Sequence, residues 1–88
     1  MNWNDATEDL LQQILSRTPR PVRDQTEAEL RQTAGQIAEE DGMNRVGVRT
    51  LVAAWIRNTP PAVRPDMARQ LEQVGLDAGE YESLLNGE

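Results

Sequence analysis

The sequence predicts an all-α fold, in which residues 1–88 form a single domain, a small bundle of four to five short helices with proline-marked corners. Apolar residues recur at helical spacing almost everywhere, and no stretch alternates for long enough to form a strand. Only three residues are aromatic and none is Phe, so small aliphatic side chains must fill most of the core. Such side chains suit helices that pack closely on one another.

The first helix is expected to begin at Asp5, because Asp5 and Glu8 have the spacing of a capping box. It ends before Pro19 and Pro21, since proline disfavours helical backbone in the residue that precedes it. The side of this helix that faces the core is formed by Trp3, Ala6, Leu10 and Ile14.

Two further apolar stripes predict the next helices. Residues 22–41 form the second, and Gly42 follows as the glycine that commonly ends a helix. Residues 48–58 form the third, whose apolar stripe is the most regular in the chain. Trp3 and Trp55 are interpreted as buried core residues, rather than as rings that stack on a bound tetrapyrrole or base. The core positions of these two helices are Leu30, Ala34, Ile37, Ala38, Val48, Leu51, Val52, Trp55 and Ile56.

The last third of the chain predicts two shorter helices, which make up a C-terminal helical extension over residues 58–88. Residues 65–74 form the fourth helix, with a proline in its first turn and Gly75 after its end. Residues 77–85 form the fifth, which opens with another capping-box pair.

The pattern T-P-x-x-V-R occurs twice, at residues 18–23 and 59–64, and is interpreted as a reused helix-to-helix corner. Proline stops the incoming helix, Val is expected to re-enter the core, and Arg lies in the first turn of the outgoing helix. A cation there is unfavourable for the helix dipole, so each Arg is expected to have either a carboxylate partner or a functional partner, of which the carboxylate is favoured.

Composition excludes several classes of function. The chain has no Cys and no His, which rules out cysteine nucleophiles, histidine catalysis and Cys/His zinc sites within the chain. The carboxylate pairs lie on polar faces or at helix ends and are interpreted as solvated. No apolar run reaches the roughly 20 residues of a membrane span. We therefore expect no enzyme activity, no cofactor, no metal and no membrane insertion, and a cytoplasmic location.

Positive charge is concentrated in one region. Residues 42–65 contain four arginines and no acid, whereas the rest of the chain carries fifteen acids and five arginines, a balance of −10. On the outward side of the third helix, arginines alternate with alanines, and small residues between arginines permit close approach of another surface. The predicted partner is another protein, and the predicted partner-binding residues are Arg45, Arg49, Ala53 and Arg57.

That outward side, which also includes Ala54, admits an alternative arrangement. Residues 59–88 must pack somewhere, and they would cover the arginines if they folded back over the third helix. In that arrangement the arginines would be neutralised within the chain by Glu72, Glu80 or Glu82.

A helix-turn-helix DNA-binding protein is the alternative function, with residues 37–56 as the motif. Small and apolar residues have the spacing of that motif, and Arg45 and Arg49 would flank a major groove. Three acids at residues 39–41 would then lie close to the phosphates, and the chain has a net charge of −6, which disfavours binding to DNA. The motif positions are Ala38, Gly42, Val48 and Leu51.

Residues 3–57 also resemble a known family. An N-terminal Trp with Ala and Leu on one helical face precedes a Pro-x-x-Val-Arg corner, an Ala-x-x-x-Gly helix end and a later Leu-x-Ala-Ala. This order resembles the small helical domain at the C-terminus of the light-independent protochlorophyllide reductase B subunit. Thr18 and Gly47 depart from the family pattern, and residues after Asn58 have no counterpart. The matching residues are Trp3, Ala6, Leu10 or Leu11, Pro19, Val22, Arg23, Ala38, Gly42, Val46, Leu51, Ala53 and Ala54.

The resemblance implies a non-catalytic interaction or regulatory module associated with (bacterio)chlorophyll synthesis. The parent enzyme holds its iron–sulfur clusters elsewhere, so the resemblance implies no cluster in this chain. The partner that it implies is a reductase subunit.

Overall fold

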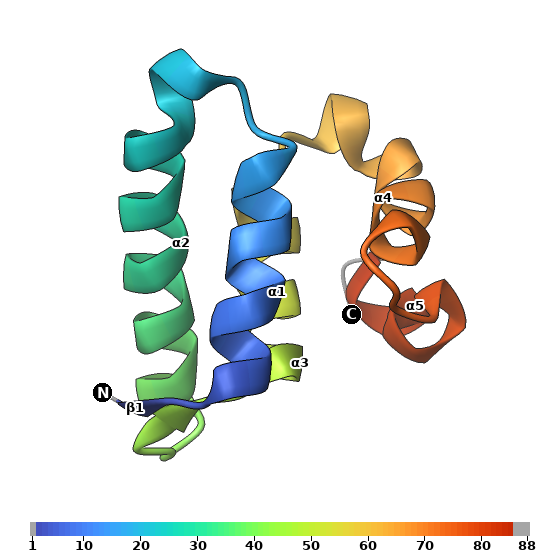
Figure 1. Ribbon diagram of the computed structural model, residues 1–88. Helices are drawn as coiled ribbons and strands as arrows, with labels where there is room; N and C mark the ends of the chain where they lie inside the picture. The colour runs from blue at the N-terminus through green and yellow to red at the C-terminus, as the bar shows by residue number, and fades with distance from the viewer. Residues whose placement is uncertain (1, 86–88) are drawn as a thin grey trace.

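The computed structural model describes residues 2–85 and confirms the all-α class (Figure 1). Helices dominate this range, and two short 3-10 helices and one pair of two-residue strands complete it. The elements, in chain order, are β1 Asn2–Trp3, α1 Asp5–Ser16, α2 Arg20–Glu40, β2 Arg45–Val46, α3 Val48–Asn58, η1 Pro61–Asp66, α4 Met67–Gln73, η2 Ala78–Tyr81 and α5 Glu82–Leu85.

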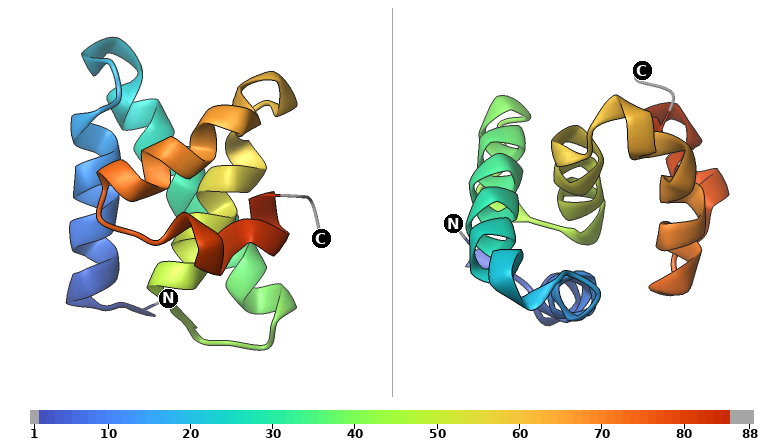
Figure 2. Two further views of the ribbon diagram at one scale, coloured as in Figure 1. Left: turned by 90° about the vertical axis from the view of Figure 1, so that its right-hand side faces the viewer. Right: turned by 90° about the horizontal axis from the view of Figure 1, so that it is seen from above.

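The helix α3 lies at the centre of the molecule. Viewed from above in Figure 2, α1 and α2 pack on one side of α3, and the segment from η1 to α5 lies on the other. The buried residues of both sides form one hydrophobic cluster, to which α3 contributes Leu51, Val52, Ala54 and Ile56. Met67 and Leu71 of α4 are fully buried in the same cluster. The C-terminal segment therefore completes the core.

Trp55 is less buried than the sequence predicts. Its side chain is only partly buried and packs against the edge of the core, as does that of Trp3. The centre of the α3 stripe is instead made by smaller residues, because Ala54 and Val52 are both fully buried. Close packing of helices on both sides of α3 favours small side chains at those positions.

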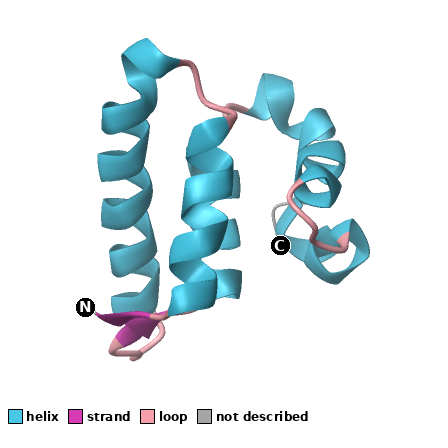
Figure 3. Cartoon of the chain, viewed as in Figure 1, coloured by secondary structure: helices cyan, strands magenta, loops and turns pink. Residues whose placement is uncertain are grey.

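The N-terminus is held to the middle of the chain by features that the sequence pattern does not show. The strands β1 and β2 pair in parallel, with Asn2 opposite Arg45 and Trp3 opposite Val46 (Figure 3). The hydroxyl of the fully buried Thr7 lies 3.3 Å from the carbonyl oxygen of Val46 and donates to it. Two-residue strands leave no alternating pattern, which is why they were not predicted.

Arg31 of α2 reinforces this attachment. Its guanidinium lies 4.8 Å from the centre of the Trp3 ring and donates to Glu8 of α1 at 2.8 Å. Its Nε donates to Glu27 on the same helix at 3.0 Å. One side chain therefore connects β1, α1 and α2.

The two T-P-x-x-V-R segments form similar corners at the same end of the molecule (top of Figure 3). The Thr18 hydroxyl donates to the Ile14 carbonyl at 3.0 Å, and the Thr59 hydroxyl donates to the Trp55 carbonyl at 2.7 Å. Each bond reaches a carbonyl in the last helical turn that lacks its usual bond from the amide four residues later, because the Thr18 and Thr59 N–H groups donate to Leu15 and Ile56 instead. In each corner the first proline is extended and precedes the next helix. The reused corner is therefore present in the structure.

The expected roles of Val and Arg in these corners were wrong. Val22 and Val63 are 44% and 45% exposed instead of entering the core. Arg23 donates to the Thr18 carbonyl at 3.1 Å, and neither it nor Arg64 forms a salt bridge among residues 2–85. The first outgoing turn lies at the surface, so its dipole is solvated and needs no carboxylate for the arginine.

Prolines and caps shift several helix starts. The helix α2 begins at Arg20, two residues earlier than predicted, because Pro21 lies in the first turn, where a missing N–H costs nothing. Pro65 lies inside η1, so α4 begins only at Met67. Asn4, and not Asp5, caps α1 by accepting from the Thr7 N–H.

The predicted glycine ends are confirmed. Gly42 and Gly75 have φ values of 70° and 87°, a region that other residues rarely adopt. After α2, the Met43 N–H donates to the Ala38 carbonyl at 2.8 Å and the Gly42 N–H donates to the Glu39 carbonyl at 3.0 Å. This pair of bonds is a Schellman motif, and the same pair occurs around Gly75.

Candidate functional site

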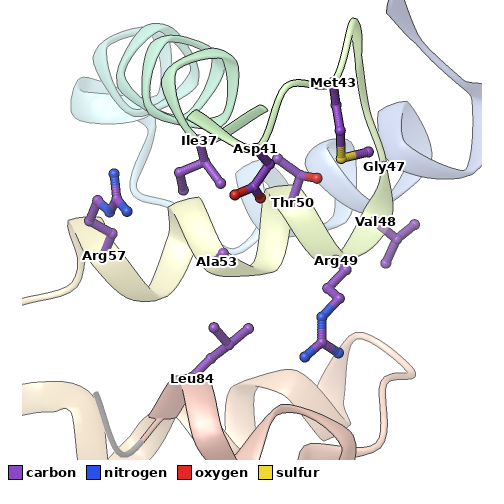
Figure 4. A pocket seen from close by; sticks show the side chains of 10 residues that line it. All are labelled: Ile37, Asp41, Met43, Gly47, Val48, Arg49, Thr50, Ala53, Arg57 and Leu84. Carbon is purple, nitrogen blue, oxygen red and sulfur yellow. The ribbon is translucent and has the colours of Figure 1, made fainter. Parts of the chain in front are cut away.

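A groove with an apolar floor and charged ends runs along α3, and we call it the α3 groove (Figure 4). It encloses about 450 Å³, within the size range of binding pockets. Figure 4 shows Arg57 and Arg49 toward its two ends, Ala53 between them, and Leu84 on the opposite wall. Its lining residues are Ile37, Asp41, Met43, Gly47, Val48, Arg49, Thr50, Ala53, Arg57 and Leu84.

Three parts of the fold build this groove. Arg49, Ala53 and Arg57 are spaced four residues apart on α3, so they follow one another along one line of the helix. The end of α2 and the turn after it supply the upper wall, because Gly42 reverses the chain beside α3. The C-terminal helix α5 supplies Leu84, which packs against the core cluster from the other side.

The two arginines of the groove are held loosely. Arg57 lies 3.7 Å from a carboxylate oxygen of Glu40, and both side chains are more than half exposed. An exposed pair of this kind contributes about 0.2–1 kcal/mol. The Arg49 guanidinium lies 5.6 Å from the centre of the Tyr81 ring and forms no salt bridge among residues 2–85. Both cations therefore keep the capacity to pair with an incoming anion.

Tyr81 of η2 marks the place where the C-terminal segment meets α3. Burial raises the pKa of its phenol above the usual 10.0, and the negative charge of Glu80 raises that pKa further. The positive charge of Arg49 acts in the opposite direction and lowers the pKa of Tyr81. The phenol is therefore neutral beside the guanidinium over the physiological pH range.

The structure brings together three of the four predicted partner-binding residues. Arg49, Ala53 and Arg57 all line the α3 groove. Arg45 lies on β2 in a separate, polar surface hollow with residues 42–44. The binding role of all four residues stays a prediction.

The outward side of α3 differs from both predicted arrangements. Ala54 is fully buried, so it is no part of a free surface. Residues of the C-terminal segment do fold back beside the arginines, but Glu72, Glu80 and Glu82 form no salt bridge with them within residues 2–85. The contact is instead made by Tyr81 and Leu84, which leaves a groove and not a closed face.

Sequence reasoning missed the walls of this groove. Ile37 was predicted as a core residue, and neither Met43 nor Leu84 was assigned a role. Periodicity shows which side of a helix is apolar but not which other helix it meets. The exposure of Met43, at 41%, is a property of the turn after Gly42 and leaves no signal in the apolar pattern.

Fold and site together define a small helical domain with an arginine-flanked apolar groove. Residues 1–85 match the family described as "Protein of unknown function (DUF2621)", and the chain belongs to that family. It is also 23% identical over 83 residues to a Bacillus subtilis (strain 168) protein named "Membrane protein YneK". That match covers 94% of this chain and spans 58% of the length of the relative. No solved structure matches the chain.

The resemblance to protochlorophyllide reductase was therefore wrong, and so was the association with chlorophyll synthesis, which leaves a reductase subunit as an untested partner. The features behind it were prolines at corners and small residues near helix ends. Any bundle of short helices needs such residues for stereochemical reasons, so they carry little family information. In the part of the chain that the structure describes, no helix is long and apolar enough to cross a membrane.

The alternative function, helix-turn-helix DNA binding, stays a prediction, and the packing of α3 disfavours it. A recognition helix must present an outer face to the major groove. Here α3, the helix in question, packs between α1 and α2 on one side and the C-terminal segment on the other, so its open surface is limited to the side that borders the α3 groove. Leu51, Val52 and Ala54 are fully buried, and Tyr81 lies beside Arg49.

Proposed function

We propose that the chain is a non-enzymatic protein-binding domain whose α3 groove binds an acidic amphipathic helix of a partner protein. The observation that carries this proposal is an apolar floor with an arginine toward each end and, among residues 2–85, only one acid, Asp41, in its lining. The chain contains no His or Cys, and among the described residues Asp41 has no second carboxylate beside it in the groove lining, which favours binding over catalysis.

Charge complementarity favours an acidic partner. Outside residues 42–65 the chain has a balance of −10, so an acidic segment is repelled from most of the surface and attracted to the arginines. Their loose internal contacts cost little to exchange for a partner's carboxylates.

The length of the groove favours a helix. Arg49 and Arg57 are eight residues apart on α3, which corresponds to about 12 Å along its axis. Two carboxylates eight residues apart on a partner helix have the same separation, and an apolar residue midway between them faces Ala53. The partner sequence is then of the form acid-x3-apolar-x3-acid.

We propose a cytoplasmic location for the domain, because its acidic composition favours solubility. The name of the Bacillus subtilis relative, a membrane protein, favours a partner helix that belongs to a membrane-associated protein. That association would come from the partner or from sequence outside residues 2–85.

A synthetic helix tests this function. The full chain, labelled with ¹⁵N, is titrated with a 16-residue amphipathic peptide that carries Glu-x3-Leu-x3-Glu, and with a matched peptide in which Lys replaces both Glu. We expect saturable NMR shifts at Ile37, Ala53 and Leu84 with the acidic peptide only. Because an exposed ion pair contributes about 0.2–1 kcal/mol, the double variant R49Q/R57Q, which removes two such pairs, should weaken binding by about twofold to thirtyfold.

Two further variants complete the experiment. Arg69→Gln removes the same charge from the exposed surface of α4 and should leave binding unchanged. Arg45→Gln determines whether the fourth predicted residue contributes. The proposal is overturned if the Lys peptide binds equally well or if the shifts map outside the groove. It is also overturned if decanoate, a fatty-acid anion, binds to the groove and the acidic peptide does not.

A further inference from the structure

A second cavity lies on the opposite side of α3 from the groove, and we call it the corner cleft. It encloses about 280 Å³ between α2, the end of α3 and the second proline corner. Around the α3 axis, Trp55 lies about 200° from Ala53, so the two cavities are separate sites. The residues that line the corner cleft are Thr26, Glu29, Leu30, Trp55, Asn58, Thr59, Pro60, Val63 and Gln70.

The chemistry of the corner cleft differs from that of the groove. Its apolar part includes the partly buried Trp55 and the exposed Val63, and its polar part consists of hydroxyl and amide groups. Glu29 is the only charged residue in its lining within the described part of the chain, and it accepts a hydrogen bond from Gln25 at 3.0 Å. Glu29 forms no salt bridge within residues 2–85. The cleft therefore combines an indole with an uncompensated carboxylate.

Elsewhere in this chain, an indole ring and a carboxylate contact the same cation. Arg31 lies over the Trp3 ring at 4.8 Å while its guanidinium donates to the carboxylate of Glu8 at 2.8 Å. Tyr81 also has a guanidinium over its ring, that of Arg49 at 5.6 Å. Of the three aromatic residues of the chain, Trp55 alone has no guanidinium over it in the described structure.

We infer that the corner cleft binds a cationic side chain, Arg or Lys, from a partner protein. The alkyl part of that side chain lies on Trp55 and Val63, and its charged end pairs with Glu29. Because the aromatic face and the carboxylate attract the same group, the site selects positive charge and rejects an isosteric neutral group. The hydroxyl and amide groups of the rim are suited to the peptide backbone on either side of the bound residue.

This site goes beyond the proposed function and does not depend on it. The α3 groove selects negative charge through Arg49 and Arg57, and the corner cleft selects positive charge through Glu29. One site can therefore fail its test while the other passes.

The experiment uses two small probes of nearly equal shape, N-acetyl-arginine methylamide and N-acetyl-citrulline methylamide. The second replaces the guanidinium by a neutral urea. Each is titrated into the ¹⁵N-labelled full chain, and the indole N–H of Trp55 and the backbone N–H groups of Thr26 and Glu29 are followed. We expect saturable shifts with the arginine probe and at least about threefold weaker binding of the citrulline probe.

Variants separate the two parts of the site. Glu29→Gln should weaken the arginine probe by about threefold or more, whereas Glu72→Gln, which removes the same charge from α4, should have no effect. Trp55→Phe should keep most of the binding because it keeps an aromatic face, and Trp55→Leu should lose it. The inference is overturned if both probes bind equally or if the Trp55 signal does not shift. It is also overturned if Glu29→Gln and Glu72→Gln have equal effects on binding.

Discussion

Tyr81 connects the C-terminal segment to α3, because its ring lies under the Arg49 guanidinium. It is also the only side chain of the sequence that titrates between about pH 7 and pH 12, since the chain has no His, Cys or Lys. Titration of the side chains at alkaline pH therefore reports on the contact between Tyr81 and Arg49.

The raised pKa of Tyr81 predicts a loss of stability at high pH. As the pH rises through the ordinary value of 10.0, the unfolded chain releases the phenol proton before the folded chain does, so unfolding becomes more favourable. The contribution of this phenol to stability should therefore fall as the pH rises above 10.0. Chemical denaturation at several pH values measures this, and Tyr81→Phe should abolish the slope. A slope that persists in Tyr81→Phe would contradict the assignment.

The substitution Arg49→Gln should change the pKa of the Tyr81 phenol. Arg49 lowers the pKa of Tyr81, so its removal should raise that pKa further. The absorbance of the phenolate as a function of pH measures this directly. Arg69→Gln is the matched control and should leave the titration where it is. An unchanged or lower pKa in Arg49→Gln would show that the two side chains are apart in solution.

At the scale of the elements, the helix α2 contains one glycine in its interior and is followed by another. Gly35 has helical backbone, and a Cβ built there meets no atom within 4 Å. Gly42 has equally free space but a φ of 70°, which side chains other than hydrogen rarely allow. The two positions therefore differ in backbone conformation and not in packing.

Alanine substitutions at these two glycines should have opposite effects. Gly35→Ala should stabilise the protein by about 0.5–1 kcal/mol, because alanine restricts the unfolded chain and favours helix. Gly42→Ala should destabilise it by about 1 kcal/mol or more, because the left-handed conformation costs about that much for alanine. Thermal and chemical unfolding of both variants measures the difference. Destabilisation by both would mean that steric crowding and not conformation decides.

The elements also show what the sequence could and could not predict. The bounds of α3 were predicted at both residues, because an uninterrupted apolar stripe ends at a proline pair. Gly42 and Gly75 were predicted as helix ends, because a positive φ leaves glycine as the natural choice. The position of Val22 was not predictable in this way, since a proline corner fixes the backbone direction but not the side that meets the core.

The candidate site also has one part that the sequence could predict and one part that it could not. Arg49, Ala53 and Arg57 come together because they belong to one helix, whose spacing is readable from the sequence. Leu84 on the opposite wall depends on how α5 packs against α3, which is a contact between segments far apart in the chain. The corner cleft combines Glu29 with Trp55 for the same tertiary reason, so no local pattern indicates it.

At the scale of the whole molecule, the core continues from the N-terminal helices into the C-terminal segment. Leu71 of α4 is fully buried and belongs to the same cluster as Leu11 of α1 and Leu51 of α3. A domain of this size has only a modest core, so residues 59–85 are expected to be required for the fold of residues 2–58.

Leu71→Ala tests this continuity. It should cost about 2–5 kcal/mol, a large part of the stability of a small domain, and unfolding should remain a single transition. Circular dichroism and tryptophan fluorescence should follow the same curve, because Trp3 and Trp55 report on the N-terminal side. Leu85→Ala, at a partly buried position, should cost less than half as much. Two separate transitions would show that the C-terminal segment is an independent unit.

The central place of α3 has a consequence for the order in which the protein is made. A chain is synthesised from its N-terminus, and α3 is complete at Asn58, whereas Leu71 of the shared core cluster and Tyr81, whose ring lies beside Arg49, come later. Until those residues leave the ribosome, the nascent chain has only α1 and α2 with which to bury that helix. The α3 groove, which needs Leu84, is assembled only after residues 1–84 have been translated.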